Sequence, residues 1–166
     1  MTLDQFWTII ERIHREADGD LDKKFELFEA ELGKLPLAEV QSFDAHFTDC
    51  LDRAYNWELW GAAYVIGGGC SDDGFWDFRS TLISCGRDIF EKALIEPESL
   101  AKLNRDVGEN LQVEGLQYIA RKVARRLGGH LLDRVQPYPK EPSGKKWEEA
   151  DAARLYPKLA KKYDFK

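Results

Sequence analysis

The sequence predicts an all-α fold, a compact helical domain of about six to eight helices. Apolar residues recur every three to four positions along most of the chain, as they do in helices that bury one face. No segment shows the alternation of apolar and polar residues that indicates a half-buried strand. Residues 57–66 are apolar almost all round, which predicts a mostly buried helix at the centre of the core.

Capping and turn residues delimit the first three helices. Thr2 and Gln5 have the spacing of a capping box and begin a helix over residues 3–17. A second helix ends at Gly33, where we expect a left-handed C-terminal cap. Pro36 suits the first turn of the long third helix that follows. The short turn between the first two helices predicts that they pack antiparallel.

The glycines at 67–69 separate the central helix from the elements that follow. Ser71 is placed to cap a helix from about Asp72 to Gly86, and negative charge in the first turn suits the helix dipole. The remaining predicted elements are a helix at 87–95, a helix at about 109–127, an ordered loop or linker at 136–146, a helix near 147–155 and a final turn at 157–159.

Length and composition predict a single globular domain over residues 1–166, since 43% of the residues are apolar and 33% are charged. No apolar run approaches the roughly 18 residues needed to cross a bilayer, and the N-terminus does not resemble a secretion leader. Cys50, Cys70 and Cys85 form no close pair, which favours a reducing compartment. We therefore expect a cytoplasmic protein with no membrane partner.

Charge is distributed unevenly along the chain, whose net charge is −6. Residues 1–100 hold 21 Asp and Glu against 9 Lys and Arg, whereas residues 101–166 hold 9 against 15. The basic residues of the predicted helix at 109–127 would suit a nucleic-acid-associated regulator. We favour instead basic C-terminal helices that lie against the acidic N-terminal ones, so nucleic acid is not the expected partner. The basic residues concerned are Arg121, Lys122, Arg125 and Arg126.

A long motif runs from the central helix into the next one. It reads AYNWELWGAAY over residues 54–64 and GGCSDDGF over residues 68–75, followed by Phe78-Arg79. On this motif the sequence resembles a bacterial family catalogued as domain of unknown function 4240, over roughly residues 1–105. The family has no assigned activity, so the resemblance implies helical architecture and bacterial origin and supplies no catalytic residues. A basic helical portion at 106–166 lies outside it.

The corner formed by Ser71, Asp72 and Asp73 is the first candidate for a functional site. Two adjacent carboxylates beside a hydroxyl could hold a hard cation such as Mg²⁺. The alternative, which we favour, is a Ser cap with first-turn acids that could pair with Arg79 or Arg87 further along the chain. We accordingly predict no metal site and no cofactor.

Aromatic residues and a cysteine complete the set of candidates. Trp57 and Trp60 could line an aromatic pocket or belong to the core, and the sequence favours neither. Cys70 could act as a nucleophile, although a buried structural thiol is the commoner role of cysteine. The candidate site therefore comprises Trp57, Trp60, Cys70, Ser71, Asp72, Asp73, Arg79 and Arg87.

Three functions remain open, and the sequence leaves undecided whether the protein is an enzyme. The favoured one is a non-catalytic protein-interaction module, an adaptor or immunity-type protein whose partner is another protein. The second is a small-molecule-binding or metal-binding enzyme with its site at Ser71-Asp72-Asp73, and the third is the regulator described above. The enzyme hypothesis requires a concave pocket with both aspartates facing in. The interaction-module hypothesis predicts that the aspartates act as cap or ion-pair residues with no cavity beside them.

Overall fold

The computed structural model describes residues 1–166, apart from the side chain of Glu109. Within the described residues the chain is helical with no β-strand, and one isolated parallel bridge joins Asn56 to Ser143. Eight of the α-helices there have seven residues or more. The all-α prediction is therefore confirmed. None of the described helices combines the length and the apolar character needed to cross a membrane.

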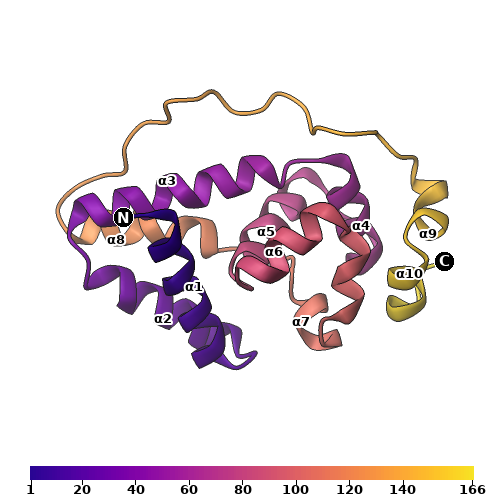
Figure 1. Ribbon diagram of the computed structural model, residues 1–166, viewed down its shortest axis with the longest axis horizontal. Coiled ribbons are helices and arrows are strands. Elements are labelled where there is room, and N and C mark those ends of the chain that lie inside the picture. The colour runs from indigo at the N-terminus through magenta and orange to yellow at the C-terminus, as the bar shows by residue number, and fades with distance from the viewer.

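The helices follow one another through short connections, except for one long connection between α8 and η3 (Figure 1). The α-helices are α1 (Leu3–Ala17), α2 (Leu21–Gly33), α3 (Leu37–Arg53), α4 (Trp57–Gly67), α5 (Asp72–Ile83), α6 (Arg87–Ile95), α7 (Arg105–Glu109), α8 (Ile119–Arg126), α9 (Ala152–Leu155) and α10 (Pro157–Tyr163). The 3₁₀ helices are η1 (Pro97–Lys102), η2 (Leu116–Tyr118) and η3 (Glu149–Asp151).

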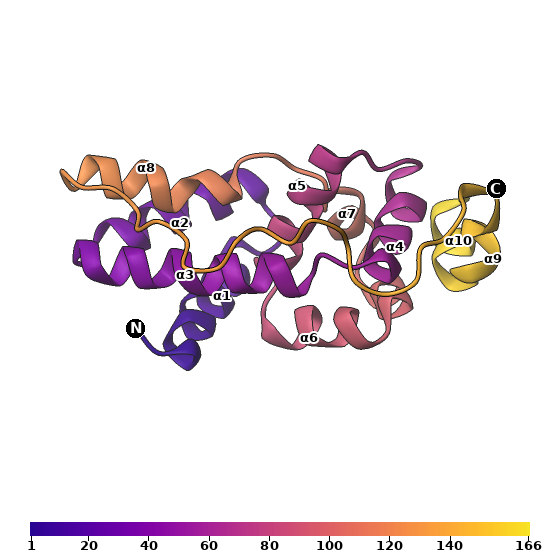
Figure 2. The same ribbon diagram turned by 90° about the horizontal axis from the view of Figure 1, so that it is seen from above.

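Helices from distant parts of the sequence share one elongated body. At one end α8 packs against both α2 and α3, and at the other end α9 and α10 pack against α4 (Figures 1 and 2). The C-terminal elements thus belong to the same packed structure as the N-terminal ones. Lys122 and Arg126 of α8 form ion pairs with Glu29 of α2, which agrees with the expected contact between basic and acidic helices.

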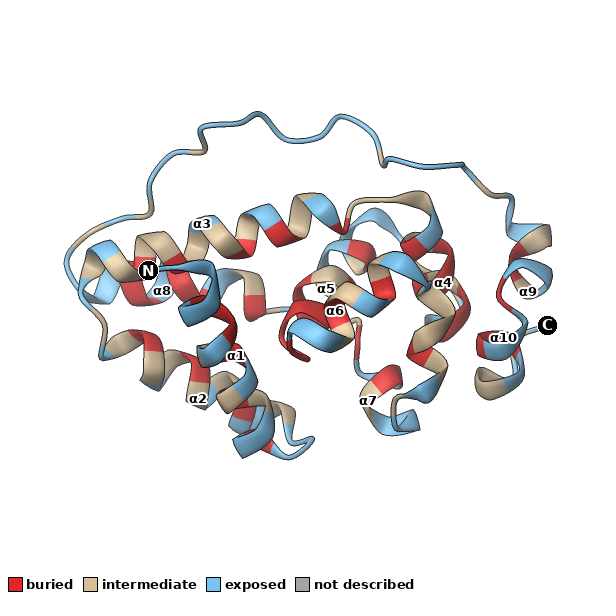
Figure 3. Ribbon diagram, viewed as in Figure 1, coloured by how far each residue is buried: buried red, intermediate tan, exposed pale blue. Residues whose placement is uncertain are grey.

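The core runs through α4, which is the mostly buried central helix that the sequence predicts (Figure 3). Gly61 lies on the face that meets α9 and α10, where a Cβ atom would fall 2.4 Å from the hydroxyl oxygen of Tyr156. Only glycine admits this approach, and the Tyr156 hydroxyl donates a 2.8 Å hydrogen bond to the Glu58 carbonyl beside it. The packing of the C-terminal helices therefore depends on a residue within the motif.

Local capping signals are confirmed at the starts of α1 and α5 but not at the end of α2. Thr2 and Gln5 form the capping box, and the Ser71 hydroxyl accepts a 3.1 Å hydrogen bond from the Gly74 amide. Gly33 is the last residue of α2 and the next residue is right-handed, so the predicted left-handed cap is wrong. Glycine is suited to this position because a Cβ there would lie 3.0 Å from the Arg126 guanidinium of α8.

The prediction of one helix over 109–127 is also wrong. The regular helix begins only at Ile119, after η2, because Gly115 adopts a φ of 130° beside the ring of Phe25.

Other predicted boundaries also differ. Pro36 stands one position before α3 rather than in its first turn. Near the C-terminus the predicted helix at 147–155 shrinks to η3 and α9, and the predicted final turn is the helix α10.

Residues 128–148 form an irregular segment, here called the strap, that runs along the outside of α3 from α8 to η3 (Figures 1 and 2). The strap is mostly exposed but is attached at both ends (Figure 3). The Gly129 amide donates to the Ala124 carbonyl at 3.0 Å, and Ser143 exchanges backbone hydrogen bonds with Tyr55 and Trp57. The Trp147 indole also donates to the Trp57 carbonyl at 2.7 Å. The segment is therefore an ordered loop, as the sequence predicts for residues 136–146.

A charged cleft beneath the strap

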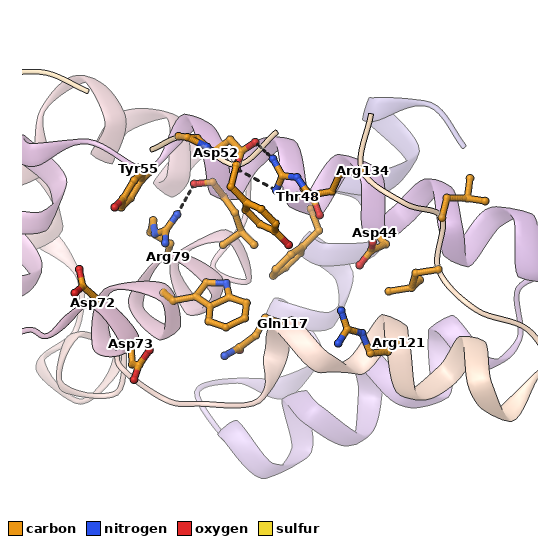
Figure 4. A pocket seen from close by; sticks show the side chains of 17 residues that line it. Asp44, Thr48, Asp52, Tyr55, Asp72, Asp73, Arg79, Gln117, Arg121 and Arg134 are labelled. Carbon is orange, nitrogen blue, oxygen red and sulfur yellow. Dashed lines mark hydrogen bonds and ion pairs between the residues drawn. The ribbon is translucent and has the colours of Figure 1, made fainter. Parts of the chain in front are cut away.

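A cleft of about 580 Å³ lies between α3, α5, the η2–α8 segment and the strap (Figure 4). Its walls come from parts of the chain that are distant in sequence. Tyr55, Arg79, Asp72 and Asp73 gather at one end, and Asp44 and Arg121 lie at the other. The lining residues are Asp44, Phe47, Thr48, Leu51, Asp52, Tyr55, Asp72, Asp73, Trp76, Arg79, Gln117, Arg121, Leu131, Leu132, Arg134, Tyr138 and Pro139.

Helix α5 supplies a stripe of three chemically different side chains to one wall. Asp72, Trp76 and Arg79 are four and three residues apart, which places them on one helical face. The wall therefore presents a carboxylate, an aromatic ring and a guanidinium, and the Arg79 side chain folds back one turn to reach the Phe75 carbonyl. Because the helix rises about 1.5 Å per residue, the first and the last of these residues begin about 10 Å apart along its axis.

The two aspartates at the start of α5 are exposed and line the cleft. Among the described residues, neither Asp72 nor Asp73 has a hydrogen-bond or ion-pair partner for its carboxylate. The pairing with Arg79 or Arg87 that the sequence leaves open is therefore not formed there, and Arg87 instead binds Asp4 at 3.0 Å. Ser71 caps the helix, but the acids beside it remain available to a ligand.

Arg79 reaches the cleft as a half-buried cation. Its Nη1 donates to the Leu51 carbonyl at 2.9 Å and its Nε to the Phe75 carbonyl at 3.3 Å. The guanidinium carbon lies 4.7 Å and 4.9 Å from the ring centroids of Tyr55 and Phe75. Within the described part of the chain, no carboxylate lies within ion-pair distance of Arg79. Burial lowers the pKa of Arg79 to about 10, so the side chain stays charged near neutral pH.

Opposite charges also meet at the strap side of the cleft. Arg134 of the strap forms an ion pair with Asp52 of α3, and its guanidinium carbon lies 3.9 Å from the ring centroid of Tyr138. Burial raises the pKa of the Asp44 carboxyl, an effect that nearby Arg121 and Arg134 partly oppose. The strap is thus attached over the cleft by a charged contact as well as at its ends.

The other predicted candidates do not line the cleft. Trp57 and Trp60 stack on each other with ring centroids 5.3 Å apart, and Trp60 stacks in turn on Phe75. The Trp60 indole donates to the Cys70 carbonyl at 3.0 Å, so it does not need the acids of α5 as partners. Burial raises the pKa of the Cys70 thiol to about 12, which keeps it protonated and a poor nucleophile. Arg87 forms its ion pair with Asp4 and does not line the cleft.

Sequence reasoning therefore found one wall of the cleft and missed the others. Asp44, Thr48 and Leu51 recur at helical spacing on α3, with Tyr55 just beyond its end, and this stripe was the only signal for that wall. The residues on η2, α8 and the strap carry no comparable pattern. Among the described residues, no group of three or more His, Cys, Asp or Glu side chains is arranged to hold a metal ion.

The fold and the cleft define an all-helical protein with a charged ligand-sized cleft beneath an ordered strap. The chain belongs to the family described as Protein of unknown function (DUF4240), whose model matches residues 1–126. The match continues beyond residue 105 to the end of α8, and it includes every wall of the cleft except the strap. No curated protein and no solved structure matches the chain.

Proposed function

We propose that this protein binds a small charged organic molecule in the cleft beneath the strap. The observation that carries the proposal is the presence, in one cleft, of the Arg79 cation and of two aspartates, none of which forms an ion pair with another described residue. A volume of about 580 Å³ falls within the range of small-molecule sites, which is roughly 300–1,000 Å³. Aromatic and aliphatic side chains between the charges add apolar contact area.

This proposal replaces the interaction module as the favoured function. That hypothesis expects Asp72 and Asp73 to be cap or ion-pair residues without a cavity beside them. The cleft lies beside both, which supports the ligand-binding alternative instead. The basic helix supports a nucleic-acid role less well, because Lys122 and Arg126 are engaged with Glu29 and Arg121 lines the cleft.

Filling the cleft should abolish ligand binding. Thr48 lines the cleft from α3, whereas Ala45 is exposed on the same helix and does not line it. In a thermal-shift screen of amino acids, short peptides, organic acids, amines and nucleotides, we expect a ligand that stabilises the wild type and Ala45→Trp equally but not Thr48→Trp. The proposal is wrong if no compound stabilises the wild type, or if the hits stabilise Thr48→Trp just as well.

Exposed apolar side chains on the strap favour a protein-interaction module as a second candidate. Leu132, Val135 and Tyr138 are 67%, 93% and 72% exposed. Large apolar side chains that remain exposed are a feature of many protein-binding segments, although Leu132 and Tyr138 also line the cleft. The strap would then act as the docking segment while the cleft lies beneath it.

Removing an exposed strap side chain tests this second candidate. A protein partner that is recovered with the wild type should bind Val135→Ser at least tenfold more weakly in a titration with purified components. Ile95→Ser is the matched control, because Ile95 is 85% exposed but lies on α6. Equal weakening by both variants, or by neither, would count against the strap as the docking segment.

A further inference from the structure

One end of the cleft, here called the charged end, brings together opposite charges that do not pair. Figure 4 shows Arg79 beside Asp72 and Asp73 there, and no ion pair joins them in the part of the chain that the structure describes. The Arg79 side chain cannot turn towards the acids without losing its hydrogen bonds to the Leu51 and Phe75 carbonyls. The space between these opposite charges is therefore open to a ligand.

Arg79 is suited to bind a carboxylate. A guanidinium has five N–H donors, and the two backbone carbonyls use two of those on Arg79. A planar carboxylate can bind the remaining donors through two parallel hydrogen bonds. A half-buried cation is costly without a counter-ion, so a ligand carboxylate would supply the partner that the described residues do not supply.

The two aspartates require that the same ligand also carries a positive group. A carboxylate at Arg79 lies at the same end of the cleft as Asp72 and Asp73, which would repel a ligand that is only an anion. A ligand that is only a cation would be repelled by Arg79. Because the three side chains gather at one end, the two charges of the ligand have to be neighbours. An α-amino acid meets this requirement, since it carries its ammonium and carboxylate groups on one carbon.

The rest of the lining favours an apolar side chain on that amino acid. The cleft continues from the charged end to Asp44 and Arg121 at its other end, so a side chain has room to extend along it. Apart from the charged groups, most of the lining residues are apolar or aromatic. They include Phe47, Leu51, Trp76, Leu131 and Leu132.

On the basis of the proposed function, we infer that the ligand is a free α-amino acid with an apolar side chain. Its carboxylate binds Arg79, its ammonium group binds at Asp72 and Asp73, and its side chain lies along the apolar lining. The acidic pair alone would not define such a site. The inference depends on the cleft and on a guanidinium that is fixed by two carbonyls and has donors to spare.

Two isomeric ligands test whether neighbouring charges are required by the wild-type protein. Norleucine and 6-aminohexanoic acid contain the same atoms, but only norleucine carries both charged groups on one carbon. In calorimetric titrations we expect norleucine to bind about tenfold more tightly or better, because only norleucine presents both groups at the charged end. Equal affinity for the two isomers, or tighter binding of 6-aminohexanoic acid, would overturn the inference.

Blocked and shortened ligands test the three parts of the amino acid separately. Norleucine amide and N-acetylnorleucine should each bind about 10- to 100-fold more weakly than norleucine, because each lacks one charge-assisted contact. Along the series alanine, 2-aminobutyric acid, norvaline and norleucine, affinity should rise about fourfold with each methylene group that is buried. An amide that binds as well as the free acid, or no gain along the series, would contradict the assignment.

Protein variants assign the two charged groups of the ligand. Arg79→Gln should lose the preference for norleucine over its amide, and the double variant Asp72→Asn, Asp73→Asn should lose the preference for norleucine over its acetylated form. Arg121→Gln, at the other end of the cleft, should keep both preferences. If Arg79→Gln fails to fold, Arg79→Lys retains the charge but loses the two-point contact, and we expect it to reduce the first preference. An unchanged preference in a folded Arg79 variant would overturn the assignment.

The two levels of the proposal fail in different ways. If the amino acids do not bind but another compound stabilises the wild type and not Thr48→Trp, the ligand class is wrong and the cleft remains the binding site. If neither the amino acids nor any other compound binds in a way that Thr48→Trp abolishes, the proposed function fails together with the inference.

Discussion

Phe75→Ala should lower the free energy of unfolding by about 3–5 kcal/mol, the usual cost of truncating a buried phenylalanine. Phe75 is fully buried on α5, and its ring stacks on Trp60 at a centroid distance of 4.8 Å. It also lies beneath the guanidinium of Arg79, at 4.9 Å. The variant therefore removes core volume and the support of the cationic end of the cleft at the same time.

Urea unfolding of Phe75→Ala beside Phe90→Ala separates these two effects. Phe90 is also fully buried, but it packs against Trp7 and Arg53 rather than against a cleft residue. Both variants should lose similar stability, whereas only Phe75→Ala should weaken ligand binding when measured at a temperature where both are folded. A Phe75→Ala protein with wild-type affinity would show that the ring does not position Arg79.

Lys24→Met should raise the free energy of unfolding at pH 7 by about 1–3 kcal/mol, because it removes a buried amine that has no carboxylate partner among the residues the structure describes. Lys24 is 3% exposed, and its Nζ lies 3.2 Å from His14 Nδ1 and 3.3 Å from Ser84 Oγ. Burial lowers the pKa of Lys24 from 10.5 in the folded protein, an effect that neighbouring Cys85 partly opposes. Methionine has a similar length and carries no charge.

The pH dependence of this effect has a definite sign. With its pKa lowered by folding, Lys24 binds fewer protons in the folded state than in the unfolded state. The wild type therefore gains stability as pH rises from the lowered pKa towards 10.5, and the advantage of Lys24→Met shrinks over that range. Urea unfolding at pH 7 to 10 measures this, with Lys23→Met as the control because Lys23 is exposed. A constant difference between wild type and Lys24→Met would contradict the assignment to this amine.

Features determined by neighbouring residues were predictable from the sequence. The capping box of α1, the Ser71 cap and the buried central helix depend on side chains within one or two turns. The helix predicted over 109–127 was wrong because Gly115 takes a left-handed conformation against Phe25, a residue on another helix. The left-handed cap predicted at Gly33 was wrong as well, since the residue after it, Lys34, is right-handed and Gly33 lies beside Arg126 of α8.

The candidate site was predictable only where it follows a single helix. Asp72, Asp73 and Arg79 share α5 and line the cleft, whereas the half-buried Trp57 stacks on Trp60, which stacks in turn on Phe75. Arg134 lies far from α3 in the sequence and reaches Asp52 only because the strap folds back over that helix. A loop without periodicity gives no indication of which of its side chains will face a cleft.

Attachment at both ends restricts how access to the cleft can change. One end of the strap is held to α8 at Gly129 and the other to the start of α4 through Ser143 and Trp147, so neither can swing away as a free flap. Any widening has to come from bowing of the stretch between these attachments, with release of Arg134 from Asp52. The strap is thus a fixed bridge over the cleft, and a ligand too bulky to pass beneath it must enter the cleft from the side.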